Sequence, residues 1–368
     1  MAAAAPISPS HPQSPKRRLR ALLSWLHLWG GLSIGMVFAL VALAGSVLVF
    51  HTELLCWQHP QLTRHPPRAD GRVLATLIER WQPHGLRSLD LPRDELPVWQ
   101  GYFEDGRRAY FAPENGALLL QRTPHDDVLL WLHEWHVELL GGKTGKQVLG
   151  VIGWAALCLL LIGLYLWWPK RGRWLTQLKM HANPPVRRWL TWHRSSGAVL
   201  LPLLVLATLT GTGMVYSNGF RAALTAVFGG DATRAPATPV RMFPRSEVRP
   251  DWTQLIAHAQ AALPDARISR LSVPKPDDDA ITFRARADGE WHPTGRSEVR
   301  LDRNGRILQV VDATTQPLGN RLHQAIYPLH IGVAGGAVLR WLIAFTGLMP
   351  AFLLVTGFLF WRRRRGRR

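Results

Sequence analysis

Cysteine is almost missing from this chain of 368 residues, which contains only Cys56 and Cys158. Cys158 lies inside an uncharged stretch and Cys56 follows another, so we do not expect a disulfide between them. A fold held together by several disulfides is therefore excluded. The two polar segments, 51–147 and 218–337, also lack a nucleotide-binding loop, a zinc-ligand spacing and a nucleophile elbow.

Acidic residues are missing from most of the chain, because all 25 lie in the two polar segments, 13 in 51–147 and 12 in 218–337. The same segments hold 26 of the 44 Lys and Arg residues. The other 18 basic residues lie in segments that contain no acidic residue, mostly 16–20, 170–194 and 362–368. Basic segments of this kind flank the cytoplasmic side of a membrane. We therefore expect both termini and the central loop in the cytoplasm and the polar segments outside.

The net charge of +19 does not indicate a nucleic-acid partner, since this topology and the attraction of basic segments to anionic lipids already account for it. The expected partner is the lipid bilayer. Four uncharged stretches are each long enough to cross a hydrocarbon core of about 30 Å at about 1.5 Å per residue. They are 28–50, 148–168, 195–216 and 341–361. None contains an acid, which excludes a membrane relay of carboxylates.

The first uncharged stretch follows basic residues, as a signal peptide would, and Ala42-Leu43-Ala44 matches a cleavage pattern. The apolar run continues to Phe50, so we expect an uncleaved helix.

The two polar segments show the same order of elements, a helix followed by four strands, with an Asn-Gly turn before the last strand. In the first segment the predicted helix is 71–81 and the strands are 86–91, 98–103, 108–111 and 117–121. In the second the helix is 252–263 and the strands are 268–273, 281–287, 298–301 and 307–311. Each segment is therefore predicted to form a small α+β module.

Four histidines mark the ends of the uncharged stretches and recur with the same glycines. Two of them are followed by glycines at +4 and +18: His27 by Gly31 and Gly45, and His193 by Gly197 and Gly211. The other two are followed by a glycine pair, by a glycine at +27 and by a tryptophan at +31: His136 by Gly163 and Trp167, and His330 by Gly357 and Trp361. The chain thus reads as two copies of one unit.

This order of motifs resembles the PepSY-associated transmembrane proteins of bacterial inner membranes. Its parts are an H-x3-G helix, an outer module with an Asn-Gly turn and an H-x4-GG…G-x3-W helix, present twice over residues 16–366. That family includes iron-uptake proteins, and one branch reduces ferric siderophores with two bound haems. The resemblance implies a multi-pass protein of the bacterial inner membrane.

The expected fold is an α-helical membrane protein with four transmembrane helices arranged as two repeats, each carrying a small α+β periplasmic PepSY-like module. The first half of the chain is predicted to contain a disordered basic cytoplasmic N-terminus (1–20), helix one (21–52), the first module (53–130) and helix two with a periplasmic extension (131–168). A basic cytoplasmic loop (169–188) joins it to the second half. That half contains helix three (189–217), the second module (218–320), helix four with a periplasmic extension (321–361) and a basic cytoplasmic tail (362–368).

Two histidines at equal depth on neighbouring helices can hold a haem b through both axial positions. Depth pairs His27 with His193 at the inner side and His136 with His330 at the outer side, so we expect two bis-His haems. Gly31 and Gly197 would let a flat macrocycle approach the backbone. The absence of a CxxCH motif speaks against covalent attachment. The other interpretation is that these histidines anchor helix ends at the membrane interface.

Three further histidines lie near the outer pair. His133 and His323 are expected to contact a propionate or a ligand, or to serve as alternative ligands, and His51 is a third alternative.

Three functions remain open from the sequence. The first is an oxidoreductase that passes electrons outward to a ferric siderophore, with a quinol or a cytoplasmic reductase as donor. The second is a membrane-anchored PepSY module that binds or regulates another protein without catalysis. The third is a repeat-built transporter component of iron uptake.

Overall fold

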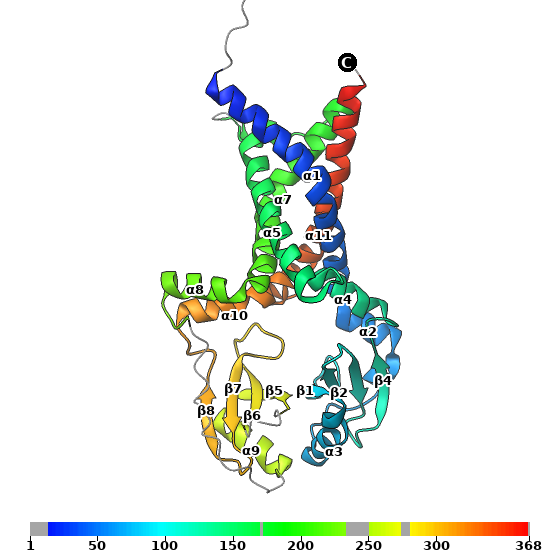
Figure 1. The fold of residues 1–368 in the computed structure, drawn as a ribbon, viewed down its shortest axis with the longest axis vertical. Helices are drawn as coiled ribbons and strands as arrows, with labels where there is room; N and C mark the ends of the chain where they lie inside the picture. Colours follow the sequence, from blue (N-terminus) through cyan, green and yellow to red (C-terminus); the bar gives the residue numbers. More distant parts are fainter. Residues whose placement is uncertain (1–13, 170–171, 233–249, 274–279, 367–368) are drawn as a thin grey trace, which may run out of the picture.

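A computed structural model describes residues 14–169, 172–232, 250–273 and 280–366. Four long helices form a bundle, and a sheet domain lies at one end of it (Figure 1). Each of the four is long and apolar enough to cross a membrane, which confirms the four predicted spans. They are α1 (Pro15–Leu48), α5 (Gly142–Trp167), α7 (Pro185–Val215) and α11 (Gly336–Arg365). Helices α1 and α7 each pack against both α5 and α11.

Small residues allow these helices to approach closely. A Cβ added to Gly153 of α5 would collide with Thr212 of α7, and one added to Gly347 of α11 would collide with Ser46 of α1. The hydroxyl of Ser46 also donates a hydrogen bond of 2.8 Å to the carbonyl of Ala344 across the same contact. Close backbone packing with interhelical hydrogen bonds is typical of helices in lipid.

Two helices that the sequence predicted as continuous are each broken. Helix α4 (Val128–Glu138) is separated from α5 by Leu139 and Leu140, which have φ angles of 50° and 58°. Helix α10 (Leu318–His330) is separated from α11 by Gly332, with φ 80°, and by a short 3-10 turn. The left-handed conformation ends a helix. His136 and His330 therefore lie on α4 and α10, which precede the spanning helices α5 and α11.

The remaining helices surround the bundle and the sheet. Helix α8 packs against α10 and extends with it to one side (Figure 1). The bounds are α2 (His51–Gln58), α3 (Gly71–Trp81), α6 (Trp174–Leu178), α8 (Ser217–Phe228) and α9 (Trp252–Ala262), with 3-10 turns at Pro60–Thr63 and Gln82–His84.

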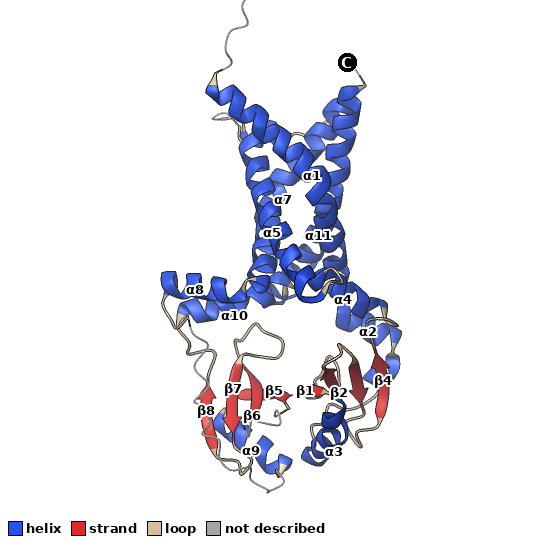
Figure 2. Cartoon of the chain, in the orientation of Figure 1, coloured by secondary structure: helices blue, strands red, loops and turns tan. Residues whose placement is uncertain are grey.

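The two polar segments form one antiparallel sheet of eight strands, in the order β4-β3-β2-β1-β5-β6-β7-β8 (Figure 2). The two predicted modules therefore meet at β1 and β5, where Leu89 faces Leu271 and Asp90 faces Arg270. The strands are β1 (Leu86–Asp90), β2 (Trp99–Phe103), β3 (Arg108–Phe111), β4 (Leu118–Arg122), β5 (Ala266–Ser272), β6 (Ile281–Ala287), β7 (Ser297–Leu301) and β8 (Ile307–Val311).

Helices α3 and α9 cover one face of the sheet and form its core. Each begins at an aspartate, Asp70 or Asp251, whose carboxylate accepts a hydrogen bond from a backbone N–H of the first turn. The core contains fully buried Trp99, Phe111 and Phe283. Because side chains alternate along a strand, the residues between the core positions of β6, including Arg284, lie on the opposite face.

Candidate cofactor site in the helical bundle

The structure brings the four repeated histidines together as two pairs. The ring centroids of His27 and His193 are 6.1 Å apart, and those of His136 and His330 are 5.9 Å apart. We call the second pair sheet-proximal, since it lies near the end of the bundle that carries the sheet, and the first pair sheet-distal. The pairing is the one that helix depth predicts.

A glycine of a neighbouring helix lies against the imidazole of each histidine. A Cβ added to Gly45 of α1 would lie 2.7 Å from Cε1 of His136, and one added to Gly211 of α7 would lie 3.0 Å from Cε1 of His330. The sheet-distal pair repeats this contact. A Cβ added to Gly163 of α5 would lie 3.0 Å from Cε1 of His27, and one added to Gly357 of α11 would lie 3.3 Å from Cε1 of His193. An added Cβ would press on the imidazole at each of these distances, so glycine allows the ring to approach the neighbouring helix closely.

A backbone carbonyl one helical turn before the glycine fixes three of the rings. Nδ1 of His136 lies 2.9 Å from the Val41 carbonyl, Nδ1 of His193 lies 2.9 Å from that of Leu353, and Nδ1 of His330 lies 3.1 Å from that of Ala207. Because a carbonyl only accepts, Nδ1 carries the proton and Nε2 is left with its lone pair. This is the tautomer that binds a metal through Nε2.

The fourth ring, that of His27, is held less firmly. It makes the same glycine contact, and it faces the carbonyl of Leu159, four residues before Gly163, as the other three rings face theirs. Its buried Nδ1 does not reach normal hydrogen-bond geometry with this or any other group among the described residues.

The two pairs fit the axial positions of a haem. A metal about 2 Å from a nitrogen of each imidazole puts the ring centroids roughly 6 Å apart, in agreement with 6.1 and 5.9 Å. Among the described residues no group of three or more His, Cys, Asp and Glu side chains could hold a bare metal ion. Two imidazoles suffice for a haem, because the macrocycle supplies the other ligands.

The two glycines that were predicted to leave room for a macrocycle, Gly31 and Gly197, have different surroundings. A Cβ added to Gly31 would meet no atom within 4 Å, so the backbone beside His27 borders open space. At Gly197 an added Cβ would be 3.5 Å from a methyl group of Leu353, an ordinary contact.

The sheet-proximal pair lies in a cavity of about 480 Å³ between the helices, which we call the bundle cavity. Its lining is mainly apolar, with three basic side chains, Arg108, Arg122 and Lys146. Arg122 already donates hydrogen bonds to the Asp127 carboxylate, at 3.1 Å, and to the Tyr110 hydroxyl, at 2.7 Å. The size and lining are those of a cofactor site, and the basic groups suit carboxylates such as propionates.

The three additional histidines differ in their positions. His133 and His51 both line the bundle cavity, beside the sheet-proximal pair. Nδ1 of His51 lies 3.2 Å from the Leu48 carbonyl. His323 instead bonds the Ser217 hydroxyl at 2.9 Å and lines a different cavity.

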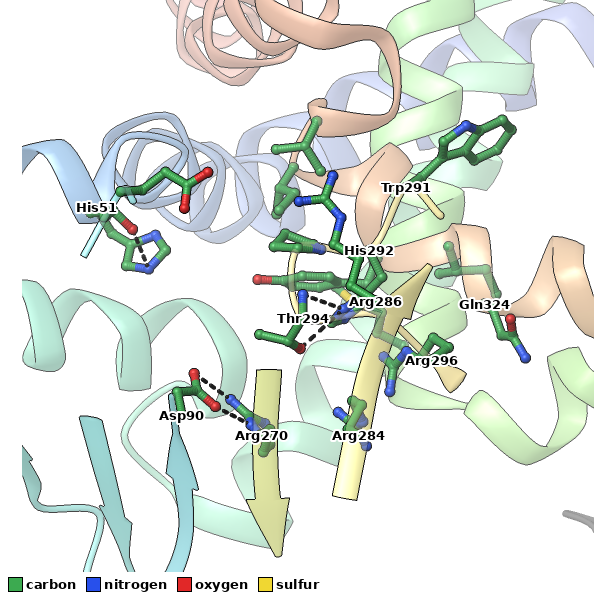
Figure 3. A pocket seen from close by; sticks show the side chains of 18 of the residues that line it. His51, Asp90, Arg270, Arg284, Arg286, Trp291, His292, Thr294, Arg296 and Gln324 are labelled. Carbon is green, nitrogen blue, oxygen red and sulfur yellow. Dashed lines mark hydrogen bonds and ion pairs between the residues drawn. The ribbon is translucent and has the colours of Figure 1, made fainter. Parts of the chain in front are cut away.

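That different cavity, which we call the chamber, has a volume of about 680 Å³ and lies between the sheet and the helices that face it (Figure 3). The chamber and the bundle cavity share part of their walls, including Tyr102, Met214 and Tyr327. A molecule in the chamber would therefore be separated from the sheet-proximal site by single side chains.

The glycines that hold the imidazoles were absent from the predicted site. Their signal was present, because Gly45 and Gly211 follow their histidines at +18 and Gly163 and Gly357 at +27. The spacing does not reveal that each glycine faces a histidine from a different helix. That contact depends on how the helices pack.

The comparisons with known proteins agree with the resemblance seen in the sequence. The family model of the PepSY-associated TM region matches residues 24–364. A search of curated proteins found no match.

Proposed function

The chain belongs to the family of the PepSY-associated TM region, and from this we propose that it is a haem-b reductase of the bacterial inner membrane. It would pass electrons across the membrane to a ferric siderophore on the periplasmic side. A haem held by each histidine pair would supply reversible one-electron chemistry. The observation that carries this proposal is the pair of matching imidazole sites at two depths of one bundle.

The residues of the chain would bind and orient the cofactors. In the sheet-proximal site the Val41 and Ala207 carbonyls hold the His136 and His330 rings with Nε2 free, and Gly45 and Gly211 set the distance of each ring from the neighbouring helix. Outer partners of this kind fix the tautomer and orientation of a metal-binding histidine. The recurrence of this contact in both halves supports the two-repeat arrangement.

The substrate would be reduced at the sheet end. One electron converts its Fe(III) to Fe(II), which hard oxygen ligands hold less tightly, so that reduction is also release. The chamber supports this placement, since it shares walls with the bundle cavity. The electron donor would be a quinol or a cytoplasmic reductase at the opposite end.

The proposal requires both termini in the cytoplasm and the sheet in the periplasm. Reporter fusions after Arg368 and within 175–185 should report a cytoplasmic location, and one within 280–290 a periplasmic location. A periplasmic C-terminus would contradict this orientation.

Electron delivery can be tested with purified protein reduced under anaerobic conditions and freed of excess reductant. Mixing with ferric citrate or Fe(III)–desferrioxamine B, in the presence of a chromogenic Fe(II) chelator, should produce Fe(II). His136→Ala should abolish this, whereas His125→Ala, at an exposed histidine outside both pairs, should not. Equal Fe(II) formation by both variants would contradict the proposal.

A further inference from the structure

The chamber carries an excess of positive charge. Six arginines and three carboxylates line it: Arg93, Arg270, Arg284, Arg286, Arg296 and Arg340, with Glu53, Asp90 and Glu95. Arg284 and Arg286 share strand β6, and Arg270 of β5 is the direct neighbour of Arg284. Figure 3 shows Arg270, Arg284 and Arg296 side by side on the sheet face that α3 and α9 leave uncovered.

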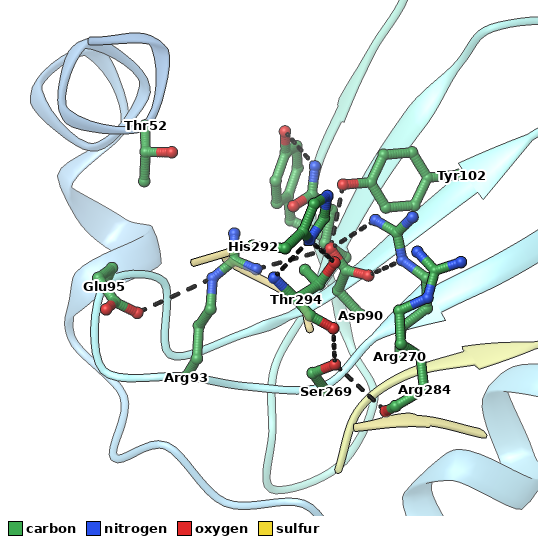
Figure 4. Close-up of polar contacts among 12 residues, drawn as sticks. Thr52, Asp90, Arg93, Glu95, Tyr102, Ser269, Arg270, Arg284, His292 and Thr294 are labelled. Atoms are coloured by element: carbon green, nitrogen blue, oxygen red, sulfur yellow. Dashed lines mark hydrogen bonds and ion pairs between the residues drawn. The ribbon is translucent and has the colours of Figure 1, made fainter. Parts of the chain in front are cut away.

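The three carboxylates are already paired with arginines on the same wall. Asp90, which is 2% exposed, accepts hydrogen bonds from Arg270 and from the Tyr102 hydroxyl (Figure 4). Arg93 lies 3.7 Å from Asp90 and 4.0 Å from Glu95. Glu53 is bonded to Arg340 of α11. These acids therefore neutralise three of the six arginines.

The other three arginines differ in their partners. Arg284 forms an ion pair with Glu298 of β7, at 3.4 Å. Neither Arg286 nor Arg296 forms an ion pair with an acid among the described residues, and Nε of Arg296 is buried without a hydrogen-bond partner. Burial and the neighbouring Arg284 charge lower the pKa of Arg296 to about 10. Crowded like charges of this kind are stabilised when an anion binds between them.

Hydrogen bonds fasten the loop between β6 and β7, which carries Arg296, to the neighbouring strands. The Glu290 carboxylate accepts hydrogen bonds from the Ala287 N–H at 3.0 Å and the Ser297 hydroxyl at 2.7 Å. The Ser269 hydroxyl donates to the Thr294 carbonyl at 2.6 Å (Figure 4). His292, in the same loop, faces Tyr327 with ring centroids 5.1 Å apart. The loop that carries Arg296 is therefore bonded to residues of β5, β6 and β7.

We propose that the chamber binds a net-anionic, carboxylate-bearing ferric chelate, with Arg286 and Arg296 as the residues that recognise its charge. Planar guanidinium groups match carboxylates with paired hydrogen bonds, and a volume of about 680 Å³ suits a small chelate. The ferric ion in this inference rests on the proposed function. The preference for an anion over a cation rests on the chamber alone.

Gallium(III) complexes test this without redox chemistry. The full-length protein is titrated calorimetrically with gallium citrate, which is anionic, and with gallium–desferrioxamine B, which is cationic. We expect gallium citrate to bind at least about tenfold more tightly, and its affinity to fall with added salt. Equal or tighter binding of the cationic complex would overturn the proposal.

Variants locate the site. Arg296→Gln and Arg286→Gln should each weaken gallium citrate by about tenfold to a hundredfold, as expected for a lost hydrogen bond between charged groups. Arg296→Lys should recover part of the loss. Arg300→Gln on β7, which removes the same charge outside the chamber lining, is the matched control and should change the affinity by less than about twofold. Unchanged affinity in both folded Gln variants would overturn the assignment.

Two further experiments distinguish a failure of this proposal from a failure of the proposed function. A haem-free variant with all four paired histidines replaced should still bind gallium citrate, so loss of haem alone contradicts only the proposed function. A short-chain phosphatidylglycerol is added as a competitor, because arginines near a membrane also bind lipid phosphates. If it binds the chamber more tightly than gallium citrate does, the chamber is a lipid site and the proposal fails.

Discussion

The two ends of the helical bundle hold their histidine pairs in the same way but give them different surroundings. Near the sheet, the pair lies in a cavity with Arg108, Arg122 and Lys146 in its lining, and a cationic chamber adjoins it. At the other end, the segments 16–20 and 362–366 beyond the pair contain basic residues and no acids. The contrast indicates that the same histidine arrangement occurs in two different surroundings, and that the sheet end has a pocket lined by polar side chains beside it.

The pairs also differ in how firmly they are fixed. Both sheet-proximal imidazoles hydrogen-bond backbone carbonyls at normal distances. In the sheet-distal pair His193 does so, whereas the contact of His27 with the Leu159 carbonyl falls outside normal hydrogen-bond geometry. A weaker hydrogen bond holds a buried imidazole less firmly. We therefore expect the sheet-distal site to lose its cofactor first when the protein is destabilised.

The largest predicted effect comes from removing one histidine from each pair. The double variant His27→Ala, His136→Ala should lose both haems, because each site keeps a single ligand. The double variant His27→Ala, His193→Ala should lose only about half of the haem and resemble the single variants, since residues acting on one site are not additive. Haem content and low-spin signals measure this. Complete loss from the within-pair double variant would show that the two sites are not independent.

Substituting a glycine that contacts a histidine should affect only one of the two pairs, and by less than removing a histidine does. In Gly45→Ala the new Cβ would lie 2.7 Å from Cε1 of His136, so the imidazole must move and only the sheet-proximal signal should shift. Gly163→Ala, at 3.0 Å from His27, should affect only the sheet-distal signal. The control is Gly35→Ala on α1, where the nearest atom is 3.9 Å away. Electron paramagnetic resonance distinguishes the two sites. Identical spectra for all three variants would refute the role of these glycines.

The smallest predicted effect is the contribution of His292 to the pH dependence of stability. Burial and the charge of Arg296 lower the pKa of His292 to about 2, against about 6.5 in an unfolded chain. The folded protein therefore binds fewer protons than the unfolded chain between these values, and stability falls as the pH drops below about 6.5. Thermal unfolding at pH 7 and pH 5 should show a smaller difference in His292→Gln than in the unaltered protein. An equal difference in both would contradict this.

Local patterns in the sequence predicted much of the fold. Alternation along 281–287 and the Asn-Gly turn at Asn304 placed the strands of the second segment, because these signals depend only on neighbouring residues. The apolar stretches likewise predicted the four spanning helices. The pairing of β1 with β5 was not predictable in this way, since Asp90 and Arg270 are 180 residues apart and meet only in the folded chain.

The sequence predicted the candidate histidine ligands of the site but not the groups that hold these histidines in place. Spacing pointed to His136 and His330 because both precede a glycine pair. It did not show that Leu139 and Leu140 would break the helix after His136. The arginines of the chamber carry no sequence motif, because they come from two strands, a helix and the loops between strands.

The central claim is that the two imidazole pairs hold two haems. The most direct measurement is a reduced-minus-oxidised spectrum of the purified protein with quantification as the pyridine haemochrome. We predict b-type haem at two per chain, released by acidified organic solvent because no covalent bond holds it. A protein purified from haem-replete cells that shows no Soret band would contradict the account.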